Sequence, residues 1–576
     1  MHRGFPVLFG FLLVGVAIAP SPASADFAIG DTLTLIQRPL PNIPALVVVG
    51  DTLRISCDAP PGTSGWTAAL VYRGTHVELD LLAAAYSPVT EWWEIDTRIP
   101  EVPFYELYDL RVEADGVPAD DCRRAVGVLP EFKEEYYFIH ITDPHLPTHL
   151  YYYQSGADTD TSEMVDLRAV IDDVNIIHPE FVLLTGDLVN EGELEDFLGR
   201  RYYSRAQRIL NEFEVPVFLT SGNHDLGGWD DTPPPAGTAR RDWWRFFGWK
   251  RLFDPPVGTP WFTQNYSFDY GPVHYIGLEG YLNYDGWRYN IYGYESFTEG
   301  QMIWLENDLA AAAGQPTRVL FYHYDFSDQI HLASMDIDMA LSGHIHRDEG
   351  NLQSPPYDLI TNCVCDGERA YRLIRVSDGE LTPRPTLSAG HLEVVYEPAN
   401  DGTHEVVTAT IENQQSERFE YGQLRIWMPD REGTLRVTGG ELQQTAAIDS
   451  KILCYVGVDI AANNVQTVTV TLDSASVPGE NPEVSALRLD PGRPRPLGPG
   501  ILLTYQLPRA GVVSLVIHDA RGRLIARLEE GWRDAGTHEA HWDERGPAGR
   551  RAAAGVYLAR LKTADAVRVR RVVLAR

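Results

Sequence analysis

The sequence is poor in basic residues. Its 576 residues carry 48 Lys and Arg against 81 Asp and Glu, for a formal net charge of −33 at pH 7, and the acids are dispersed along the chain. This balance repels phosphate backbones and anionic lipid, and no stretch supplies a basic groove, so we exclude nucleic acid and the membrane surface as main partners. A hydrophobic content of 44% is that of a folded chain, which at this length is expected to hold several domains.

Long apolar runs are also scarce. The one near the start, Phe5 to Ile18, follows Arg3 and precedes the small residues of "SPASA". Because this run is too short for a comfortable membrane span, we interpret residues 1–25 as a secretory signal peptide. The expected mature protein has no transmembrane segment and is secreted, periplasmic or attached to the cell surface.

The sequence has only five cysteines. Cys57 and Cys122 fall in one segment, where they could form a disulfide in an exported protein, while Cys363, Cys365 and Cys454 leave at least one thiol over. The alternative is that these residues are buried as small hydrophobic side chains.

The pattern of apolar residues divides the chain. Short alternating stretches between Pro and Gly predict a β-sandwich at residues 26–131 and a second β-domain at 385–482. Between them, residues 132–384 alternate apolar strands with helical periods. A Pro/Gly-rich linker at 483–495 leads to a last β-sandwich at 496–576. The predicted fold class is multidomain α/β plus β, a central α/β sandwich flanked by β-sandwich domains.

The predicted strands of the central domain end on residues of a restricted kind. The strands are "YYFIHI", "FVLLT", "VPVFLT", "VLFY" and "DMALS", and helices are predicted at Thr161 to Ile177, near Glu193 to Phe213, and from a capping box at Thr298. In an α/β sheet the carboxyl ends of the strands form one edge, where loops converge on a ligand. The residues at these ends are Asp143, His145, Asp187, Asn223, His224, Asp225, His323, His344 and His346.

These side chains suit a dinuclear metal centre. Carboxylate, amide and imidazole are ligands for Mn, Fe or Zn, and the strand ends offer no thiolate that would select a softer ion. Seven such ligands are too many for one ion with open positions, but they fit two divalent or trivalent ions that share one carboxylate. Asn223 supplies a neutral oxygen, so that two divalent ions, two carboxylates and a hydroxide retain a charge of about +1, which attracts a phosphate ester.

The motifs D-x-H, GD, GNH[DE], H and GHxH occur in this order, so residues 135–376 resemble a calcineurin-like metallophosphoesterase. The resemblance implies that His224 faces the substrate and that Asp225 orients its ring. It implies that one metal is held by Asp143, His145, Asp187 and His346, and the other by Asp187, Asn223, His323 and His344.

The resulting hypothesis is a secreted phosphoesterase of small phosphate esters. A metal-bridging hydroxide would attack the ester in line, with phosphodiesters slightly favoured over phosphomonoesters. The alternative from another class is a cell-surface adhesion or carbohydrate-binding protein that uses the phosphoesterase fold as a scaffold. We favour the enzyme, because a scaffold has no physical reason to gather these groups at strand ends.

Four residues depart from better-known branches of the family. Asn190 stands where purple acid phosphatases have a metal-binding tyrosine, and Glu191 stands where protein Ser/Thr phosphatases have an arginine that grips phosphate. Tyr324 and Asp325 follow His323 in place of the frequent HHP or HxP. His323 itself is present as the expected metal ligand, while the sequence does not decide which substrate contacts the residues after it make.

The remaining candidates have a structural interpretation beside a functional one. Cys363 and Cys365 either flank the site or, as we favour, belong to two closing strands. Residues 226–297, rich in Trp, form either a lid with a subsite for the leaving group or a satellite core. His331 keeps a minor substrate role as an alternative. The histidines expected to be ordinary strand or loop residues are His140, His149, His178 and His274.

The last predicted unit has a signature of its own. "YQLPRAGVVSLVIHDARGRLIARL" and the residues after it resemble the FlgD-like immunoglobulin-type repeat found at the C-termini of many secreted bacterial proteins. The resemblance implies a sorting signal that engages secretion machinery or the cell surface.

Overall fold

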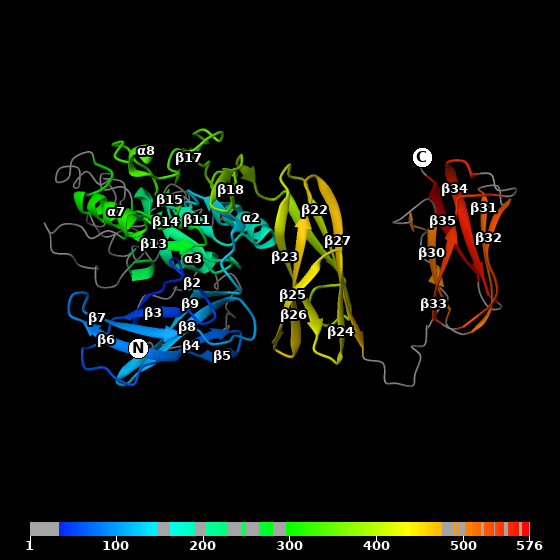
Figure 1. Ribbon diagram of the computed structural model, residues 1–576, viewed down its shortest axis with the longest axis horizontal. Coiled ribbons are helices and arrows are strands. Elements are labelled where there is room, and N and C mark those ends of the chain that lie inside the picture. Colours follow the sequence, from blue (N-terminus) through cyan, green and yellow to red (C-terminus); the bar gives the residue numbers. More distant parts are fainter. Residues whose placement is uncertain are drawn as a thin grey trace, which may run out of the picture. The chain divides into compact units, whose positions relative to one another are not determined.

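The structure is a computed structural model, and it describes most of the chain in two compact units (Figure 1). One unit comprises Met1–Arg431 with Leu435–Asp473, and the other contains the C-terminal residues from Ser474. Within the described part, no helix is long and apolar enough to cross a membrane. The described residues are 34–146, 162–190, 202–226, 243, 245–248, 264–279, 295–474, 488–489, 493–494, 501–507, 510–519, 523–534, 536–546, 551–563 and 567–574.

Several of the sequence interpretations fall outside these residues. They are the signal peptide at 1–25, His149, and most of the Trp-rich segment, of which 226, 243, 245–248, 264–279 and 295–297 are described. Trp243 is one of the described residues of that segment, and it is fully buried in the core of the central domain.

The first β-domain is built from two sheets. Their inward side chains, such as Ile55, Leu70 and Val126, form one core. Cys57 and Cys122 lie in this core as free thiols, so the disulfide that the sequence left open is not formed. One sheet has the order β1 (Ile36–Arg38), β3 (Thr52–Cys57), β7 (Trp92–Arg98) and β6 (Asp80–Ser87), and the other β2 (Ala45–Val48), β9 (Val117–Leu129), β8 (Leu107–Ala114), β4 (Thr67–Tyr72) and β5 (Thr75–Glu78).

The central domain also contains two sheets rather than one. Strands β10, β11 and β12 are parallel in the first sheet, and β14 to β17 are parallel in the second. The first has the order β12 (Val217–Thr220), β11 (Val182–Thr185), β10 (Glu135–Ile141), β18 (Ala370–Ser377) and β19 (Glu380–Pro383), with β20 (Leu387–Ser388) beside β18. The second has the order β13 (Tyr266–Tyr270), β14 (Val273–Gly277), β15 (Thr317–Phe321), β16 (Met339–Ser342) and β17 (Tyr357–Ile360).

The inner strands of these sheets, such as β11, β15 and β16, are buried on both faces, which explains why they read as continuous apolar runs. Aromatic side chains such as Phe138, Phe181 and Phe321 fill the space between the two sheets. The helices cover the outer faces: α2 (Ser162–Ile177) and α3 (Tyr202–Leu210) pack on the first sheet, and α7 (Glu299–Ala311) and α8 (Leu332–Met335) on the second.

The helix predictions are confirmed where residues are described. Helix α2 matches the expected span to within one residue, and α3 forms the described end of the helix expected near 193–213. Helix α7 begins after Thr298, whose side chain accepts a hydrogen bond from the Gln301 backbone, while the Gln301 side chain accepts one from the Thr298 backbone. This is the capping box that the sequence indicated.

The second β-domain packs against the central domain rather than standing apart. Buried residues of the two domains, such as Val174 and Ile426, belong to one continuous core. The domain consists of β21 (Leu392–Glu397), β22 (Val406–Asn413), β27 (Asn464–Ser474) and β24 (Gly433–Thr438) in one sheet, and β23 (Phe419–Pro429), β26 (Lys451–Ile460) and β25 (Glu441–Ile448) in the other.

A buried ion pair ties the three domains of this unit together. Arg425, on β23, contacts Glu106 of the first domain at 3.0 Å and Glu214 of the central domain at 3.0 Å. The hydroxyl of Tyr455 donates to the other oxygen of Glu106 at 2.9 Å. A buried charge of this kind is held by all its partners together, so the three domains form one compact unit.

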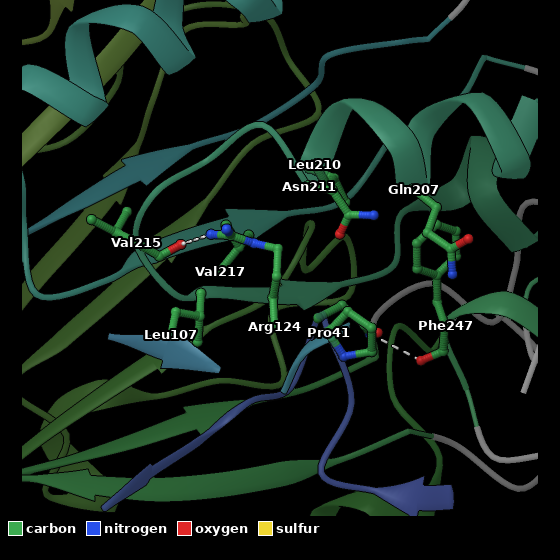
Figure 2. Close-up of a pocket in the computed structure, with 10 residues that line it drawn as sticks. Pro41, Leu107, Arg124, Gln207, Leu210, Asn211, Val215, Val217 and Phe247 are labelled. Carbon is green, nitrogen blue, oxygen red and sulfur yellow. Dashed lines mark hydrogen bonds between the residues drawn. The ribbon is translucent and has the colours of Figure 1, made fainter. Parts of the chain in front are cut away.

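A small polar junction joins the first and central domains (Figure 2). Arg124 donates to the backbone carbonyl of Val215 at 3.5 Å, and Asn42 donates to the carbonyl of Phe247 at 2.9 Å. Pro41, Leu107 and Gln207 line the same pocket. The junction lies just before β12, and it therefore braces a strand whose far end carries site residues.

The last domain has two sheets around a core that contains Leu503, Leu515 and Trp542. Two short strands of this domain, β28 (Arg488–Leu489) and β29 (Arg493–Pro494), lie inside the segment expected to be a linker and pair with β30 (Ile501–Leu507). The boundary of the domain is therefore earlier than expected. The other strands are β31 (Gly511–Asp519), β32 (Leu524–Arg533), β33 (Gly536–Trp542), β34 (Gly555–Lys562) and β35 (Val567–Leu574).

Candidate metal centre

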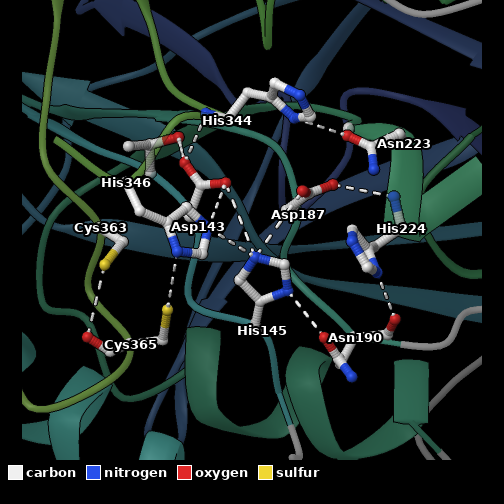
Figure 3. A network of polar contacts seen from close by, with 12 residues as sticks. Asp143, His145, Asp187, Asn190, Asn223, His224, His344, His346, Cys363 and Cys365 are labelled. Carbon is white, nitrogen blue, oxygen red and sulfur yellow. Dashed lines mark hydrogen bonds and ion pairs between the residues drawn. The ribbon is translucent and has the colours of Figure 1, made fainter. Parts of the chain in front are cut away.

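All seven residues expected to bind metal meet at the carboxyl ends of the parallel strands, and Figure 3 labels all of them except His323. Asp143 and His145 follow β10, Asp187 follows β11, and Asn223 begins the short helix α4 (Asn223–Leu226) after β12. From the second sheet, His323 follows β15, and His344 and His346 follow β16. The centre therefore lies where the edges of two sheets meet, whereas the sequence argument assumed one sheet.

The backbone turns sharply at most of these positions. A left-handed conformation costs an ordinary residue roughly 1–3 kcal/mol, and it persists only where the surrounding structure imposes it. Such strain is common at functional sites because it aims side chains that a relaxed loop would not aim. The residues with positive φ are Asp143 at 54°, His145 at 52°, Asp187 at 49°, His344 at 74° and His346 at 51°.

Two glycines of the motifs are required by the closeness of the loops. A Cβ atom on Gly222 would lie 2.2 Å from Oδ1 of Asp187. A Cβ atom on Gly343 would lie 1.9 Å from Oγ1 of Thr142 and 2.4 Å from Oδ2 of Asp143. Any larger residue at either position would push a metal-binding carboxylate out of place.

The first group of donor atoms surrounds the Oδ1 atom of Asp143. Nε2 of His346 lies 3.4 Å from this oxygen and Nε2 of His145 lies 3.7 Å from it. The two imidazole nitrogens are 3.1 Å apart, and Nε2 of His145 is 3.7 Å from Oδ2 of Asp187. Two carboxylates and two imidazoles therefore point at one position.

The second group shares Asp187 with the first. Oδ2 of Asp187 lies 3.1 Å from Nε2 of His323, and Oδ1 of Asn223 lies 3.0 Å from the same nitrogen. Nδ1 of His344 lies 3.1 Å from Oδ1 of Asn223. One carboxylate, one amide oxygen and two imidazoles thus converge, as expected for two metal positions with a common carboxylate.

Hydrogen bonds outside the centre decide which nitrogen of each imidazole faces inward. Nδ1 of His323 donates to the backbone carbonyl of Thr185 at 2.7 Å, and Nδ1 of His145 donates to Oδ1 of Asn190 at 2.9 Å. In both rings Nε2 is then left as the atom that binds a metal. Metal-binding histidines are commonly held in this way.

Asp143 offers the clearest test of whether metal fits. Its Oδ2 accepts hydrogen bonds from the Thr142 hydroxyl at 2.7 Å and the His344 backbone at 2.9 Å. Its Oδ1 is buried and has no hydrogen-bond partner among the described residues. A buried carboxylate oxygen without a partner is costly unless a cation neutralises it, so the donor set fits metal ions.

The charges of the centre point to the same conclusion. Burial opposes a charged imidazole at His323, but the carboxylates of Asp187 and Asp143 outweigh it and raise the pKa of His323 to about 9. The nearby Asp143 carboxylate and Cys363 side chain raise the pKa of His346 to about 10. The carboxylates thus draw positive charge into the positions where the metal ions are expected.

His224 lies beside the centre, and its contacts differ from those expected. Its ring is 4.8 Å from that of His145, measured between centroids, and its Nδ1 donates to the backbone carbonyl of Asn190 at 2.7 Å. The carboxylate of Asp225 accepts instead from the backbone N–H groups of Leu188, Val189 and Gly222. The expectation that Asp225 orients His224 is therefore wrong: Asp225 holds the loop after β11, and Asn190 orients the ring.

Two aromatic side chains lie at the rim, and of these the sequence pointed to Tyr324 but not to Phe326. The rings of Tyr324 and Phe326 lie 5.1 and 5.5 Å from the ring of His344, and Phe326 is 41% exposed. Asp325 fixes their loop, since its carboxylate accepts from the backbone N–H groups of Ser327, Gln329 and Ile330. Their position directly after His323 was the available signal.

The histidines interpreted as structural do not join the centre where they are described. His140 is buried, its two ring nitrogens bond to the hydroxyls of Thr361 and Thr185, and burial lowers its pKa to about 3. His274 pairs with Asp269 and Asp308. His178 ends the turn after α2, and His331 precedes α8.

Cys363 and Cys365 were expected within two closing strands. The strands exist as β17 and β18, but both cysteines lie in the loop between them, beside His346. The interpretation that they flank the site is therefore the one that the structure supports.

Comparison with known proteins gives two family matches. Residues 136–348 match the model of the calcineurin-like phosphoesterases, and residues 502–566 match that of the FlgD Ig-like domain. A glycerophosphodiester phosphodiesterase, GpdQ, of Enterobacter lignolyticus (strain SCF1) is 25% identical over 147 residues, which are 25% of this chain and 42% of the relative. This chain thus aligns with less than half of that protein.

Solved structures with similar folds include two phosphatases. Purple acid phosphatase PPD1 from yellow lupin (Lupinus luteus) has 11% identity and a TM-score of 0.33, with 63% of this chain and 70% of that chain covered. A dimetal phosphatase from Danio rerio has 13% identity and a TM-score of 0.31, with 45% of this chain and 100% of that chain covered.

The family match runs from β10 to the turn after β16 and includes the seven donor residues described above. Residues 136–348 therefore form a calcineurin-like phosphoesterase domain, and residues 502–566 form an FlgD Ig-like domain.

Proposed function

We propose that the protein is a metal-dependent phosphoester hydrolase with a dinuclear centre. The observation that carries the proposal is the meeting of two donor groups that share the Asp187 carboxylate. When bound, two Mn, Fe or Zn ions would supply an activated water molecule and neutralise charge on the phosphoryl oxygens. One ion would be held by Asp143, His145, Asp187 and His346, and the other by Asp187, Asn223, His323 and His344.

The donor residues also set the charge of the centre. Asp143 and Asp187 are the two carboxylates in it, and burial makes each of them depend on cations nearby. Asn223 contributes an oxygen without a further negative charge. The loaded centre therefore keeps a net positive charge, which favours an anionic ester.

His224 is the residue that we assign to the substrate. Because Nδ1 donates to the Asn190 carbonyl, Nε2 is the nitrogen that would meet a phosphoryl or leaving-group oxygen. In the ring protonated at both nitrogens, the Nε2–H group can steady the charge of the transition state or pass its proton to the departing oxygen. Burial lowers the pKa of His224 and opposes this charged form, whereas the Asp187 carboxylate favours it. Its backbone N–H donates to Oδ1 of Asp187 at 2.9 Å, which ties its position to the shared carboxylate.

Phosphodiesters are the favoured substrates in this proposal. The support for this choice is the similarity of the chain to a glycerophosphodiester phosphodiesterase.

The test compares two chromogenic esters that differ only in the second substituent on phosphorus. The protein is loaded with Mn²⁺, and kcat/KM is measured for the diester and the matching monoester. We expect a higher value for the diester. A higher value for the monoester would redirect the proposal to phosphatase substrates, and turnover of neither by the metal-loaded protein would refute it for simple esters.

We also propose that the protein acts outside the cytoplasm. The pattern of residues 1–25 and the FlgD Ig-like domain support export and attachment through secretion machinery or the cell surface. The test is the fraction of full-length protein found outside spheroplasts, with a chain that starts after residue 25 as the control. Equal retention of both chains inside the cell would contradict export.

A further inference from the structure

A second cluster of possible metal ligands lies on the far side of His346 (Figure 3). Its donor atoms come from His346, Cys363, Cys365 and Asp366, and all of them lie within 4.8 Å of one another. Both cysteines are buried, while the side chain of Asp366 is 69% exposed. The cluster is therefore reachable from solvent through the carboxylate.

The individual distances place three of the groups around one point, and Sγ of Cys363 lies within 4.8 Å of their donor atoms. Sγ of Cys365 lies 3.9 Å from Nδ1 of His346 and 3.5 Å from Oδ2 of Asp366. The same carboxylate oxygen lies 3.7 Å from Nδ1 of His346. Around a tetrahedral zinc ion with Zn–S bonds of about 2.3 Å, neighbouring ligand atoms stand roughly 3.8 Å apart. Small side-chain movements would close the cluster on an ion.

The loop that carries the cysteines is held rigidly against the dinuclear centre. The backbone N–H groups of Val364 and Cys365 donate to the carbonyls of Thr142 and Asp143 at 3.0 and 3.2 Å. On the other side, Asp166 of α2 accepts from the Gly367 backbone at 2.8 Å and from the Arg369 side chain at 2.7 Å. Preorganised ligands of this kind favour metal binding because little order is lost when the ion arrives.

The outward-facing nitrogen of His346 has different neighbours from those of His145 and His323. His145 and His323 turn their outer nitrogen to oxygen acceptors, an Asn side chain and a backbone carbonyl. The outer nitrogen of His346 turns to sulfur and carboxylate. Each ring nitrogen of a deprotonated imidazole can bind its own metal, so one ring can join two sites.

We propose that His346, Cys363, Cys365 and Asp366 form a separate thiolate metal site that takes Zn²⁺ and is joined to the dinuclear centre through the His346 imidazole. Two sulfur ligands make this site softer than the oxygen- and nitrogen-lined centre beside it. The ions in the two places are therefore expected to differ. The proposal goes beyond the hydrolase function and does not depend on it.

The test uses Cd²⁺ as a probe, because cadmium bound to thiolate absorbs in the ultraviolet whereas cadmium bound to oxygen and nitrogen does not. The full chain is stripped of metal, reduced and titrated with Cd²⁺. We expect thiolate absorbance that is lost in Cys363→Ala and Cys365→Ala. Cys454→Ala, which removes a buried cysteine of the second β-domain, is the matched control and keeps the signal.

Two further measurements separate this proposal from the others. Asp187→Asn is expected to lose metal from the dinuclear centre and to keep the thiolate absorbance. Metal binding at the thiolate site can therefore be measured even when the dinuclear centre binds none. In the unmutated protein, bound Zn²⁺ should protect Cys363 and Cys365 from alkylation mapped by mass spectrometry. A Cys363–Cys365 disulfide in protein isolated with Zn²⁺, or reduced thiols without absorbance or protection, would overturn the proposal.

Discussion

The side chain of Asn190 accepts a hydrogen bond from Nδ1 of His145 at 2.9 Å. The backbone carbonyl of the same residue accepts from Nδ1 of His224 at 2.7 Å. One residue therefore sets the orientation of a metal-binding ring with its side chain and that of a substrate-facing ring with its backbone. These two roles can be separated, because a substitution changes the first contact and keeps the second.

Asn190→Ala is expected to weaken metal binding. The change frees the His145 ring to rotate, and loss of such a supporting contact commonly lowers metal affinity roughly 10- to 100-fold. Competitive titration with a metal indicator measures the affinity. If the affinity is unchanged, Asn190 does not position His145 in solution. At saturating metal the activity should largely return, since the contact to His224 is made by the backbone.

His224→Ala is expected to lower the rate while metal stays bound. Removing a general acid or a charge-stabilising group typically costs about 10²- to 10⁴-fold in kcat. A ring nitrogen of His224 also lies within 4.8 Å of the donor atoms of His145 and Asp187, so a ligand role is the rival assignment. Metal content and kcat are measured on the same sample, with His331→Ala as a control. A variant that loses metal would make His224 a ligand.

Asp173 should make the unit less stable as pH rises. Burial on α2 raises its pKa to about 7, and the neighbouring Asp172 adds to this, while hydrogen bonds from Gly390, Tyr371 and Gln415 oppose it. An unfolded Asp has a pKa of about 3.9, so between about pH 4 and 7 the folded state holds a proton that the unfolded state releases. The stability that this proton contributes is present below this window and is lost across it, by at most roughly 1.4 kcal/mol per pH unit.

The measurement is the melting temperature of unmutated protein and Asp173→Asn from pH 5 to 8. The amide mimics the protonated acid, so the variant should lose less stability than the unmutated protein as pH rises. Glu306→Gln removes an exposed carboxylate on α7 and serves as the control. Parallel curves for Asp173→Asn and the unmutated protein would contradict the prediction.

Glu106→Gln is expected to loosen the three-domain unit. It leaves Arg425 with less compensation at a buried position, and breaking a buried ion pair costs about 3–5 kcal/mol. Asp96→Asn is the matched change at the exposed pair with Arg54, where about 1 kcal/mol or less is expected. Urea denaturation of both variants gives the comparison, and equal losses would show that Arg425 does not hold the domains together.

Much of the fold and the centre could be predicted from the sequence because both leave local signals. Buried parallel strands give continuous apolar runs, the capping box of α7 is four residues long, and each donor residue directly follows a strand. The seven donors could therefore be named before their distances were known.

What could not be predicted depends on contacts between distant segments. Asp225 is adjacent to His224 in the chain, yet its carboxylate turns to the loop after β11, and a carbonyl 34 residues away holds the ring instead. The three domains are held in one unit by the ion pair of Arg425 with Glu106, two residues that are 319 positions apart in the sequence. Neither relation leaves a pattern in the residues around it.

The most direct test of the central claim is the metal content of Asp187→Asn, measured together with its hydrolysis of a phosphodiester. Because Oδ2 of Asp187 belongs to both donor groups, the account predicts that the variant loses the ions of the dinuclear centre together with its activity while its fold is kept. A variant that retains both ions of the dinuclear centre, or that hydrolyses the ester without them, would contradict a centre built on a shared carboxylate.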